Sequence, residues 1–375
     1  MEIGVPKEIK PQESRVGLTP AAVAELIRRG HKVLVQSQAG TAIGFRDADY
    51  QAAGALIVAD ADTLFGACEL IVKVKEPQAQ ERAWLTPEHC LFTYLHLAAD
   101  RQQTEDLLNS GATCIAYETV SDERGGLPLL APMSEVAGRM AIQAGAHCLE
   151  TPQGGRGVLL GGVPGVPAGR VTILGAGVVG SQALAMAVGL GAEVSVLDTR
   201  IEALRRLDAQ YGNRVQTLYA SRDAVEKRVL AADLVIGAVL VPGAAAPKLI
   251  DAELVRRMLP GAVLVDVAID QGGCAETSRP TTHDAPTYVV DEVVHYCVSN
   301  MPGAVARTAT LALNNATLPF VIELAERGCK RALEDNVRLR DGLNLARGRI
   351  THPGVAEAHG LVCHSAQEVL AMGRG

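Results

Sequence analysis

The chain has 375 residues, a length that predicts two domains. It carries 35 Lys and Arg residues against 42 Asp and Glu residues, which gives a net charge of −7 at pH 7. This balance argues against a nucleic-acid-binding protein, because such proteins usually carry a basic surplus. Hydrophobic residues make up 48% of the chain and charged residues 21%, so we expect packed cores and exclude a disordered chain.

Strand-like and helix-like segments alternate along the chain, which predicts mainly parallel α/β sheets. Thr19 and Pro20 predict the start of a helix that Gly30 ends, and Asp100 and Gly111 bound a second helix in the same way. The other expected segments, in chain order, are strands at 1–6, 31–36, 68–77, 90–98 and 113–120, a helix at 134–150, a loop at 153–170, a strand at 171–175, a helix at 178–189, a strand at 192–198, a helix at 201–210, a strand at 214–220, a helix at 222–230, a strand at 232–240, a helix at 252–258, strands at 262–269 and 287–298, and helical sequence from 304 to about 346.

The two series of alternating segments predict two doubly wound α/β domains. We expect the middle series to form a continuous Rossmann domain over residues 129–306. The C-terminal helices would then return to the first domain, which would comprise residues 1–128 and 307–375.

The eight cysteines are scattered and show no CxxC or Cys/His ligand spacing. We therefore expect reduced, mostly buried thiols in a reducing compartment, and no metal site. The N-terminus lacks a long apolar run, so we expect no signal peptide. Residues 171–192 carry no charge, but the five glycines among them favour a buried strand–turn–helix over a membrane span. These features predict a cytoplasmic protein without membrane partners.

The strongest local motif is GRVTILGAGVVG at residues 169–180, which places glycines in GxGxxG spacing between a β-branched strand and a helix. These glycines would allow a tight turn, a close approach to a pyrophosphate, and close packing of helix on strand. Asp198 closes the next strand, where a carboxylate binds the ribose hydroxyls and favours NAD over NADP. Arg200 and Arg205 lie close enough to Asp198 in the sequence that binding of NADP remains an open alternative. The alternative is an ordinary Gly-rich βα turn. The predicted phosphate-binding positions are Gly175, Gly177, Val178, Val179 and Gly180.

Further cofactor contacts are expected where other strands end, because an open α/β sheet binds ligands at the carboxyl ends of its strands. Each of these residues could equally be a plain strand end. They are Val239 and Leu240 at the end of one strand, Val267, Ala268, Ile269 and Asp270 at the end of another, and Val298, Ser299, Asn300 and Met301 where a third ends.

Four residues at loops or strand ends are candidates for the chemistry. Arg15 can bind a carboxylate through two donors, Lys75 can add a charge or polarise a carbonyl, and His96 can transfer a proton near neutral pH. Asp270 would face the nicotinamide side. Taken singly, each has a simpler interpretation. Arg15 and Lys75 could be surface charges, His96 a buried histidine and Asp270 a helix cap.

Taken together, the segments MEIGVPKEIKPQESRVGLTP, IVKVKEP, YLHLA, LGAGVVG, VDVAIDQGG and YCVSNMPGAVARTAT resemble bacterial L-alanine dehydrogenases nearly from end to end. The resemblance implies a cytoplasmic homohexamer with a central Rossmann domain inserted into a discontinuous substrate domain. It also implies NAD-dependent oxidative deamination of L-alanine to pyruvate and ammonia, and the reverse reductive amination, by hydride transfer with general acid/base catalysis.

The resemblance further implies residue roles. Arg15 and Lys75 would bind substrate, and His96 and Asp270 would be the acid/base pair. NAD contacts would include Ser134, Val178, Asp198, Val239, Leu240, Ile269, Arg279, Ser299, Asn300 and Met301. Two positions depart from the family pattern near the adenosine: Ala203 stands where a basic residue is common, and Ala220 where a serine is common, although Ser221 is adjacent.

Three alternatives remain open at this point. One is the nucleotide-binding domain of a proton-translocating transhydrogenase, which would transfer hydride between two dinucleotides. A second is a related lysine- or saccharopine-type amino-acid dehydrogenase. The third is a non-catalytic NAD-binding regulator, against which the four candidate residues argue.

Overall fold

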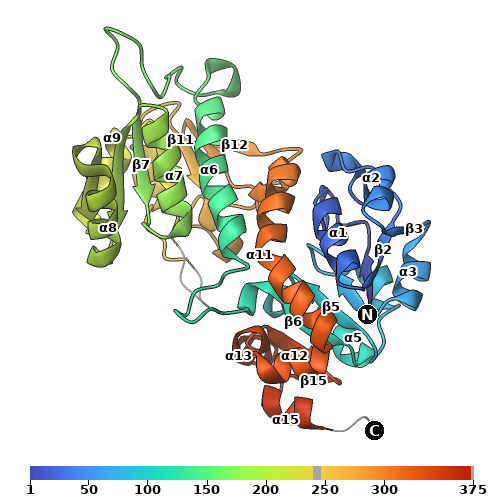
Figure 1. Ribbon diagram of the computed structural model, residues 1–375. Coiled ribbons are helices and arrows are strands. Elements are labelled where there is room, and N and C mark those ends of the chain that lie inside the picture. Colours follow the sequence, from blue (N-terminus) through green and yellow to red (C-terminus); the bar gives the residue numbers. More distant parts are fainter. Residues whose placement is uncertain (240–245, 373–375) are drawn as a thin grey trace. The chain divides into compact units, whose positions relative to one another are not determined.

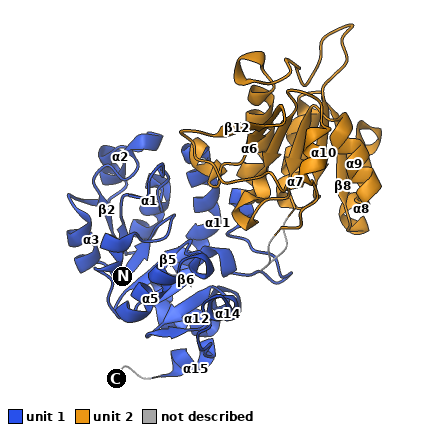
Figure 2. Ribbon diagram, turned by 180° about the vertical axis from the view of Figure 1, so that it is seen from behind, with its two compact units in different colours: residues 1–133, 305–375 blue, residues 134–304 orange. Residues whose placement is uncertain are grey.

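The computed structural model describes residues 1–239 and 246–372, which form two compact units (Figure 1). Unit 1 comprises Met1–Met133 and Val305–Gly375, and unit 2 comprises Ser134–Ala304 (Figure 2). The chain therefore leaves unit 1, builds unit 2 and returns to unit 1. Both units have a doubly wound α/β arrangement, so the fold class predicted from the sequence is confirmed.

Unit 1 contains a sheet in the strand order β15-β14-β6-β5-β4-β1-β2-β3. Its strands run parallel except for β14 and β15, which come from the returning C-terminal segment. The strands are β1 (Glu2–Val5), β2 (Lys32–Gln36), β3 (Leu56–Val58), β4 (Leu70–Val72), β5 (Cys90–Thr93), β6 (Thr113–Ala116), β14 (Leu343–Ala346) and β15 (Arg349–Ile350). The helices are α1 (Pro20–Arg28), α2 (Asp47–Ala52), α3 (Ala61–Ala67), α4 (Ala79–Arg82), α5 (Arg101–Ser110), α11 (Ala306–Arg327), α12 (Cys329–Asp335), α13 (Val337–Arg340), α14 (Pro353–His359) and α15 (Ala366–Ala371).

Unit 2 contains a second sheet in the order β12-β13-β11-β10-β7-β8-β9, in which only β12 pairs antiparallel among the described strands. Helix α6 (Ala131–Cys148) leads into this unit. The other elements are β7 (Arg170–Leu174), α7 (Val178–Gly189), β8 (Glu193–Asp198), α8 (Ile201–Tyr211), β9 (Val215–Tyr219), α9 (Arg222–Ala231), β10 (Leu234–Gly237), α10 (Ala252–Arg256), β11 (Val263–Asp266), the 3-10 helix η6 (Val267–Gln271), β12 (Thr287–Val290), β13 (Val293–Tyr296) and the 3-10 helix η7 (Met301–Val305).

Local capping signals explain the helices that the sequence predicts well. Thr19 accepts a hydrogen bond from the backbone N–H of Ala22, 3.2 Å away, and Pro20 opens α1. Asp100 accepts from the backbone N–H of Gln103, 3.0 Å away, at the start of α5, and Gly111 ends that helix in the left-handed region with φ 70°. Both predicted helices are confirmed.

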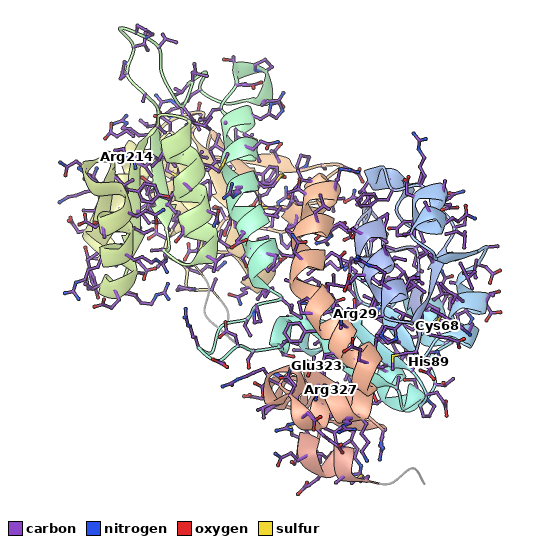
Figure 3. All side chains as sticks on the ribbon, viewed as in Figure 1. Arg29, Cys68, His89, Arg214, Glu323 and Arg327 are labelled. Carbon is purple, nitrogen blue, oxygen red and sulfur yellow. The ribbon has the colours of Figure 1, made fainter. Side chains whose placement is uncertain are left out.

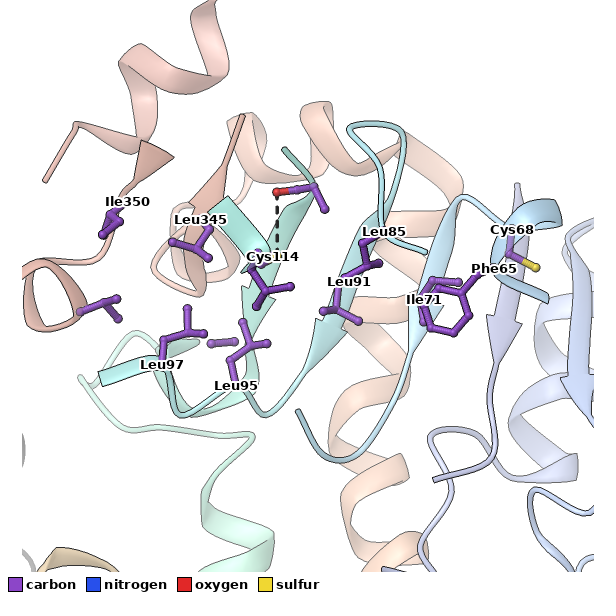
Figure 4. Packing of buried hydrophobic residues seen from close by; sticks show 14 of the residues in the cluster. Phe65, Cys68, Ile71, Leu85, Leu91, Leu95, Leu97, Cys114, Leu345 and Ile350 are labelled. Atoms are coloured by element: carbon purple, nitrogen blue, oxygen red, sulfur yellow. Dashed lines mark hydrogen bonds between the residues drawn. The ribbon is translucent and has the colours of Figure 1, made fainter. Parts of the chain in front are cut away.

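A continuous apolar layer packs one face of the sheet in unit 1 (Figure 4). Leu91 of β5, Ile71 of β4 and Cys114 of β6 meet Leu345 and Ile350 of the C-terminal segment in this layer. Each fully buried Leu or Ile side chain stabilises the fold by about 1.5–3 kcal/mol. The returning segment is therefore held to unit 1 by core packing as well as by strand pairing.

Three kinds of expectation about elements were wrong. Residues 343–346, expected to continue a helix, form β14, because the open edge of β6 offers backbone partners and burial that outweigh helix propensity. The expected strand at 287–298 is a hairpin that turns at Asp291 and Glu292, which take φ of 46° and 62° without a glycine to signal the turn. The strands expected over 68–77, 90–98, 113–120 and 262–269 are shorter and end at Val72, Thr93, Ala116 and Asp266.

Within the residues that the structure describes, no helix is long and apolar enough to cross a membrane. The same residues contain no group of three or more His, Cys, Asp or Glu side chains that could hold a metal ion.

Candidate active site

The GxGxxG motif forms the turn from β7 into α7 in unit 2. Gly175 has a φ of 108°, and a Cβ there would lie 2.5 Å from the carbonyl oxygen of Ala238, so only glycine fits. A Cβ on Gly180 would overlap the carbonyl oxygen of Gly175, which explains how the helix packs directly against the turn. A Cβ on Gly177 would contact Arg200 Nη2 only loosely, at 3.8 Å, so the backbone there remains accessible to a ligand.

The first turn of α7 suits a phosphate group. Gly177 is the N-cap residue and supplies no side-chain cap, and Val178 and Val179 follow as the first helical residues. The N–H groups of a first helical turn have no partners within the helix, and the helix dipole favours an anion there. The described residues therefore fit the pyrophosphate of a dinucleotide.

Asp198 lies at the end of β8, beside this turn. Its Oδ2 accepts from the backbone N–H of Ala176 at 2.7 Å, and its Oδ1 accepts from that of Arg200 at 2.7 Å. The Arg200 guanidinium adds contacts of 3.3 Å to both oxygens. Burial raises the pKa of Asp198, but these hydrogen bonds and the Arg200 charge outweigh that effect. The pKa is therefore lowered overall, and the carboxylate is ionised at neutral pH.

A cavity of about 590 Å³ lies against the Gly-rich turn and α8. Among its lining residues are Glu135, Gly177, Val178, Arg200, Ala203 and Arg206. Ala203 thus occupies a wall of this cavity. Ala220 follows β9 and donates its backbone N–H to the Asp198 carbonyl at 3.1 Å, whereas the Ser221 hydroxyl accepts from Ala224 N–H and caps α9.

Most of the other predicted cofactor residues of unit 2 follow the parallel strands β10, β11 and β13, and so lie along one edge of its sheet. Val239 lies two residues after β10 rather than at its end, and Leu240 falls outside the described residues. All four predicted residues from Val267 to Asp270 lie in the 3-10 helix η6 and not on strand β11. Asp266 is fully buried and accepts from the N–H groups of Ala268, Cys274 and Ala275 and from the hydroxyl of Ser278, which fixes this turn.

The remaining predicted positions also have defined places. Ser134 lies in α6. The Arg279 guanidinium lies 4.1 Å from the centre of the Tyr288 ring, a cation–π contact. Val298, Ser299 and Asn300 follow β13, the Asn300 carbonyl lies 2.9 Å from His283 Nε2, and Met301 begins η7.

In unit 1, Arg15 is almost fully buried and makes a bidentate ion pair with Glu13. Its Nε and Nη2 donate to the two carboxylate oxygens of Glu13 at 2.7 and 2.6 Å. Its Nη1 lies 3.1 Å from the thioether sulfur of Met133, a weak acceptor. A substrate carboxylate would be a far stronger partner at this end of the guanidinium.

Lys75 follows β4 in a loop that a second, buried lysine holds in place. Glu8 accepts from the backbone N–H groups of Val74 and Lys75 at 2.7 and 3.2 Å, and from Nζ of Lys73 at 3.0 Å. Lys73 also donates to Glu81 at 2.7 Å. Burial lowers the pKa of Lys75, and the positive charge of Arg15 lowers it further.

His96 lies just after β5, in the left-handed region with φ 51°. Glu118 accepts from its backbone N–H at 2.6 Å, and the Glu118 carboxylate lies 4.0 Å from Nδ1 of the ring. The ring stacks on Tyr94 with 5.9 Å between centres. The His96 side chain is 46% exposed. The partial burial of its ring lowers the pKa of His96 and the Lys75 charge acts in the same direction, although Glu118 opposes both, so the neutral ring is favoured at pH 7.

Lys75 and His96 follow the adjacent parallel strands β4 and β5, and the Thr93 hydroxyl donates to the Lys75 carbonyl at 2.9 Å. The charge of Arg15 acts on Lys75, and the charge of Lys75 acts on His96. Sequence reasoning missed Lys73 and Glu118. The signal for Lys73 was a lysine inside the apolar run IVKVKEP, which requires a buried partner. His89, labelled in Figure 3, is a structural histidine. Its Nδ1 lies 2.9 Å from the Thr86 backbone nitrogen and its Nε2 lies 2.8 Å from the Phe65 carbonyl oxygen.

Comparison with known proteins assigns this arrangement to a family. The models described as alanine dehydrogenase/PNT, N-terminal domain and C-terminal domain match residues 4–137 and 141–353. The chain belongs to the alanine dehydrogenase/PNT family. The resemblance read from the sequence motifs is thereby confirmed, and the chain is a dehydrogenase of a family that uses a nicotinamide cofactor.

Individual relatives agree. The alanine dehydrogenase of Halomonas elongata is 62% identical over 96% of this chain and 97% of its own length. That of Bacillus subtilis is 52% identical over 99% of this chain and 98% of its own. A solved structure of an L-alanine dehydrogenase has 55% identity and a TM-score of 0.93, covering 96% of this chain and 99% of the other. A transhydrogenase from Sinorhizobium meliloti has 25% identity and a TM-score of 0.80, covering 94% and 99%.

Proposed function

We propose that the chain catalyses the NAD-dependent oxidative deamination of L-alanine to pyruvate and ammonia, and the reverse reductive amination. The carrying observation is that Lys75 and His96 follow the adjacent strands β4 and β5, with Arg15 near enough for its charge to act on Lys75, in a chain 62% identical to an alanine dehydrogenase. Such an arrangement suits a small amino acid or keto acid that carries one carboxylate.

Arg15 and Lys75 act on the substrate side of this proposal. The Arg15 guanidinium, held by Glu13, binds the carboxylate through its Nη1 end in place of Met133. The Lys75 amine lies near enough to Arg15 for the Arg15 charge to act on it, and it polarises the keto oxygen of pyruvate. Holding the anion by two groups fixes its orientation before any bond changes.

His96 is the proposed acid/base group. A neutral ring accepts a proton when alanine is oxidised and returns it in the reverse direction, at the substrate oxygen or nitrogen. Glu118 holds the backbone at His96 and lies close enough to favour the protonated ring once it forms. Asp270 is proposed as the second member of the pair, on the nicotinamide side.

Unit 2 is proposed as the NAD-binding domain, for which the sequence predicts residues 129–306, and unit 1 as the substrate domain. The turn at Gly175–Gly180 would hold the pyrophosphate and Asp198 the ribose hydroxyls; bound NAD supplies the hydride acceptor. The ionised Asp198 repels a 2′-phosphate, which favours NAD over NADP. The further cofactor contacts proposed from the sequence are Ser134, Val179, Val239, Leu240, Val267, Ala268, Ile269, Asp270, Arg279, Val298, Ser299, Asn300 and Met301. A cytoplasmic homohexamer without membrane or nucleic-acid partners completes the proposal.

The test is formation of reduced nicotinamide, followed by its absorbance, with L-alanine and NAD at mildly alkaline pH. Other amino acids, and a second dinucleotide without any amino acid, are assayed in parallel. Turnover only with L-alanine supports the proposal. Preference for lysine or saccharopine, or hydride transfer between two dinucleotides, would instead support one of the two rival enzymes.

Lys75→Ala sharpens this test. We expect it to abolish turnover while NAD binding, measured by calorimetry, is largely retained. The matched control is Lys32→Ala, because the Lys32 side chain is 71% exposed and pairs only loosely with Glu2 at 3.2 Å. Full activity in Lys75→Ala would remove this residue from the mechanism.

A further inference from the structure

Two cysteines from distant parts of the chain meet in unit 1. Cys90 is the first residue of β5 and Cys329 is the first residue of α12. Their sulfur atoms lie 2.7 Å apart, and both thiols are free. Because an S–S bond is about 2.05 Å long, bond formation requires the two sulfurs to move together by less than about 1 Å.

The strand pairing argues against Cys114, a thiol on the neighbouring strand, as a partner of Cys90. Cys114 of β6 is opposite Leu91 in the register of β5 and β6, and both side chains belong to the apolar layer on one face of the sheet (Figure 4). Side chains alternate along a strand, so Cys90 faces the other side of the sheet from Leu91. Cys114 would have to cross the sheet to reach Cys90.

The two thiols differ in access to small molecules. Cys90 is buried, whereas Cys329 is partly exposed. The hydrogen bond with Cys329, together with burial, raises the pKa of Cys90, so its thiol remains protonated near neutral pH. A soluble reagent therefore meets Cys329 first and Cys90 only afterwards.

We propose that Cys90 and Cys329 form an oxidisable dithiol, which a low-molecular-weight disulfide converts into an internal disulfide that joins the two chain segments of unit 1. Neither residue belongs to the catalytic or binding machinery described above. The proposal is therefore independent of the proposed function.

The exchange proceeds in two steps. The Cys329 thiolate attacks one sulfur of the small disulfide, forms a mixed disulfide and releases one small thiol, which takes up the proton that Cys329 lost. The Cys90 thiolate, formed by loss of its proton, then attacks Cys329 Sγ, forms the internal bond and releases the second small thiol, which takes up that proton. In total the two protein thiols are oxidised, and the small disulfide is reduced to two thiols.

The position of the pair predicts an effect on stability rather than on catalysis. Cys90 begins β5, while His96 follows the opposite end of that strand after Thr93. The bond would close a chain segment with a sequence separation of 239 residues, which includes all of unit 2. Cross-links over long segments restrict the unfolded chain most strongly in the chain-entropy description.

The experiment treats the full chain with glutathione disulfide and then analyses it by intact mass and by peptide mapping without reduction. We expect the loss of two hydrogen masses, a cross-linked peptide pair that contains Cys90 and Cys329, a raised unfolding temperature and unchanged turnover. Dithiothreitol should reverse all the changes. A glutathione adduct that persists on Cys329, a link between other cysteines, or no reaction would each overturn the proposal.

Single variants provide the controls. Cys90→Ser should leave glutathione on Cys329, because the second step lacks its attacking thiol. Cys329→Ser should prevent the reaction at this site, and Cys363→Ser, which removes an exposed cysteine elsewhere, should not affect the internal link. An internal link that still formed in Cys329→Ser would contradict the assignment. If either variant failed to fold, the peptide map of the unaltered chain would still decide.

Discussion

The buried Lys73 cluster allows a sharp prediction about unit 1. Lys73 is fully buried, and its amine donates to Glu8 at 3.0 Å and to Glu81 at 2.7 Å. Lys73→Met retains a long unbranched side chain but removes the cation. Two buried carboxylates are then left without a positive partner. Because Glu8 also holds the backbone of Lys75, the change reaches the candidate active site.

The expected cost follows from the burial of the cluster. Breaking a buried ion pair by removing one partner costs about 3–5 kcal/mol of unfolding free energy, because the remaining charge is uncompensated. The matched control is Lys32→Met on β2, whose side chain is 71% exposed in its pair with Glu2. Pairs of this exposed kind contribute about 0.2–1 kcal/mol. Lys73→Met should therefore lower the free energy of unfolding severalfold more than Lys32→Met does.

The pH dependence supplies a second readout. Burial raises the pKa of Glu8 above its ordinary value even with Lys73 present, and loss of the lysine charge raises it further. In the range between the unfolded and folded pKa values the folded state binds more protons, so stability falls as pH rises. The penalty of Lys73→Met should consequently be smaller at about pH 5 than at about pH 8.

Trp84 makes the measurement specific to unit 1. It is the only tryptophan in the sequence, and its ring centre lies 5.5 Å from that of Phe65 in the apolar core. Urea unfolding followed by tryptophan fluorescence therefore reports unit 1 separately from unit 2. A Lys73→Met penalty no larger than that of Lys32→Met, or one that grows on acidification, would refute the reasoning.

Three further predictions concern the two candidate sites. Gly180→Ala should weaken NAD binding at least about tenfold in calorimetry, because its Cβ overlaps the Gly175 carbonyl oxygen; unchanged affinity would contradict the account of the turn. Asp198→Ala should weaken NAD binding and relax discrimination against NADP in parallel kinetics, whereas an unchanged preference would show that this carboxylate does not bind the ribose. In the pH profile of kcat/KM for alanine oxidation, the acid limb should have an apparent pKa below the usual histidine value of 6.5. His96→Gln should lower kcat by about 10²–10⁴-fold and abolish that limb. An apparent pKa above 6.5 would argue against His96 as the base.

Features encoded by neighbouring residues could be predicted from the sequence. The cap at Thr19 and the stop at Gly111 each depend on one side chain and the adjacent backbone. The GxGxxG turn and Asp198 are similar, because their spacing reflects one βαβ unit. The alternation of strands and helices then sufficed to predict the doubly wound fold class.

Features that depend on distant partners could not be predicted in this way. Residues 343–346 become a strand because β6 presents an open edge, and β6 lies more than 200 residues earlier in the chain. Lys73 obtains its partner Glu8 at a separation of 65 residues. The sequence could place Arg15 in the candidate site, but the buried pair that it makes with Glu13 required the side-chain geometry.

The most direct test of the central claim is a crystal structure of the full chain with both NAD and pyruvate bound. We predict the pyruvate carboxylate on Arg15 and Lys75, the keto oxygen within hydrogen-bonding distance of His96 or Lys75, and the keto carbon against the nicotinamide ring. Pyruvate bound far from that ring, with Arg15 and Lys75 making no contact to it, would contradict the account.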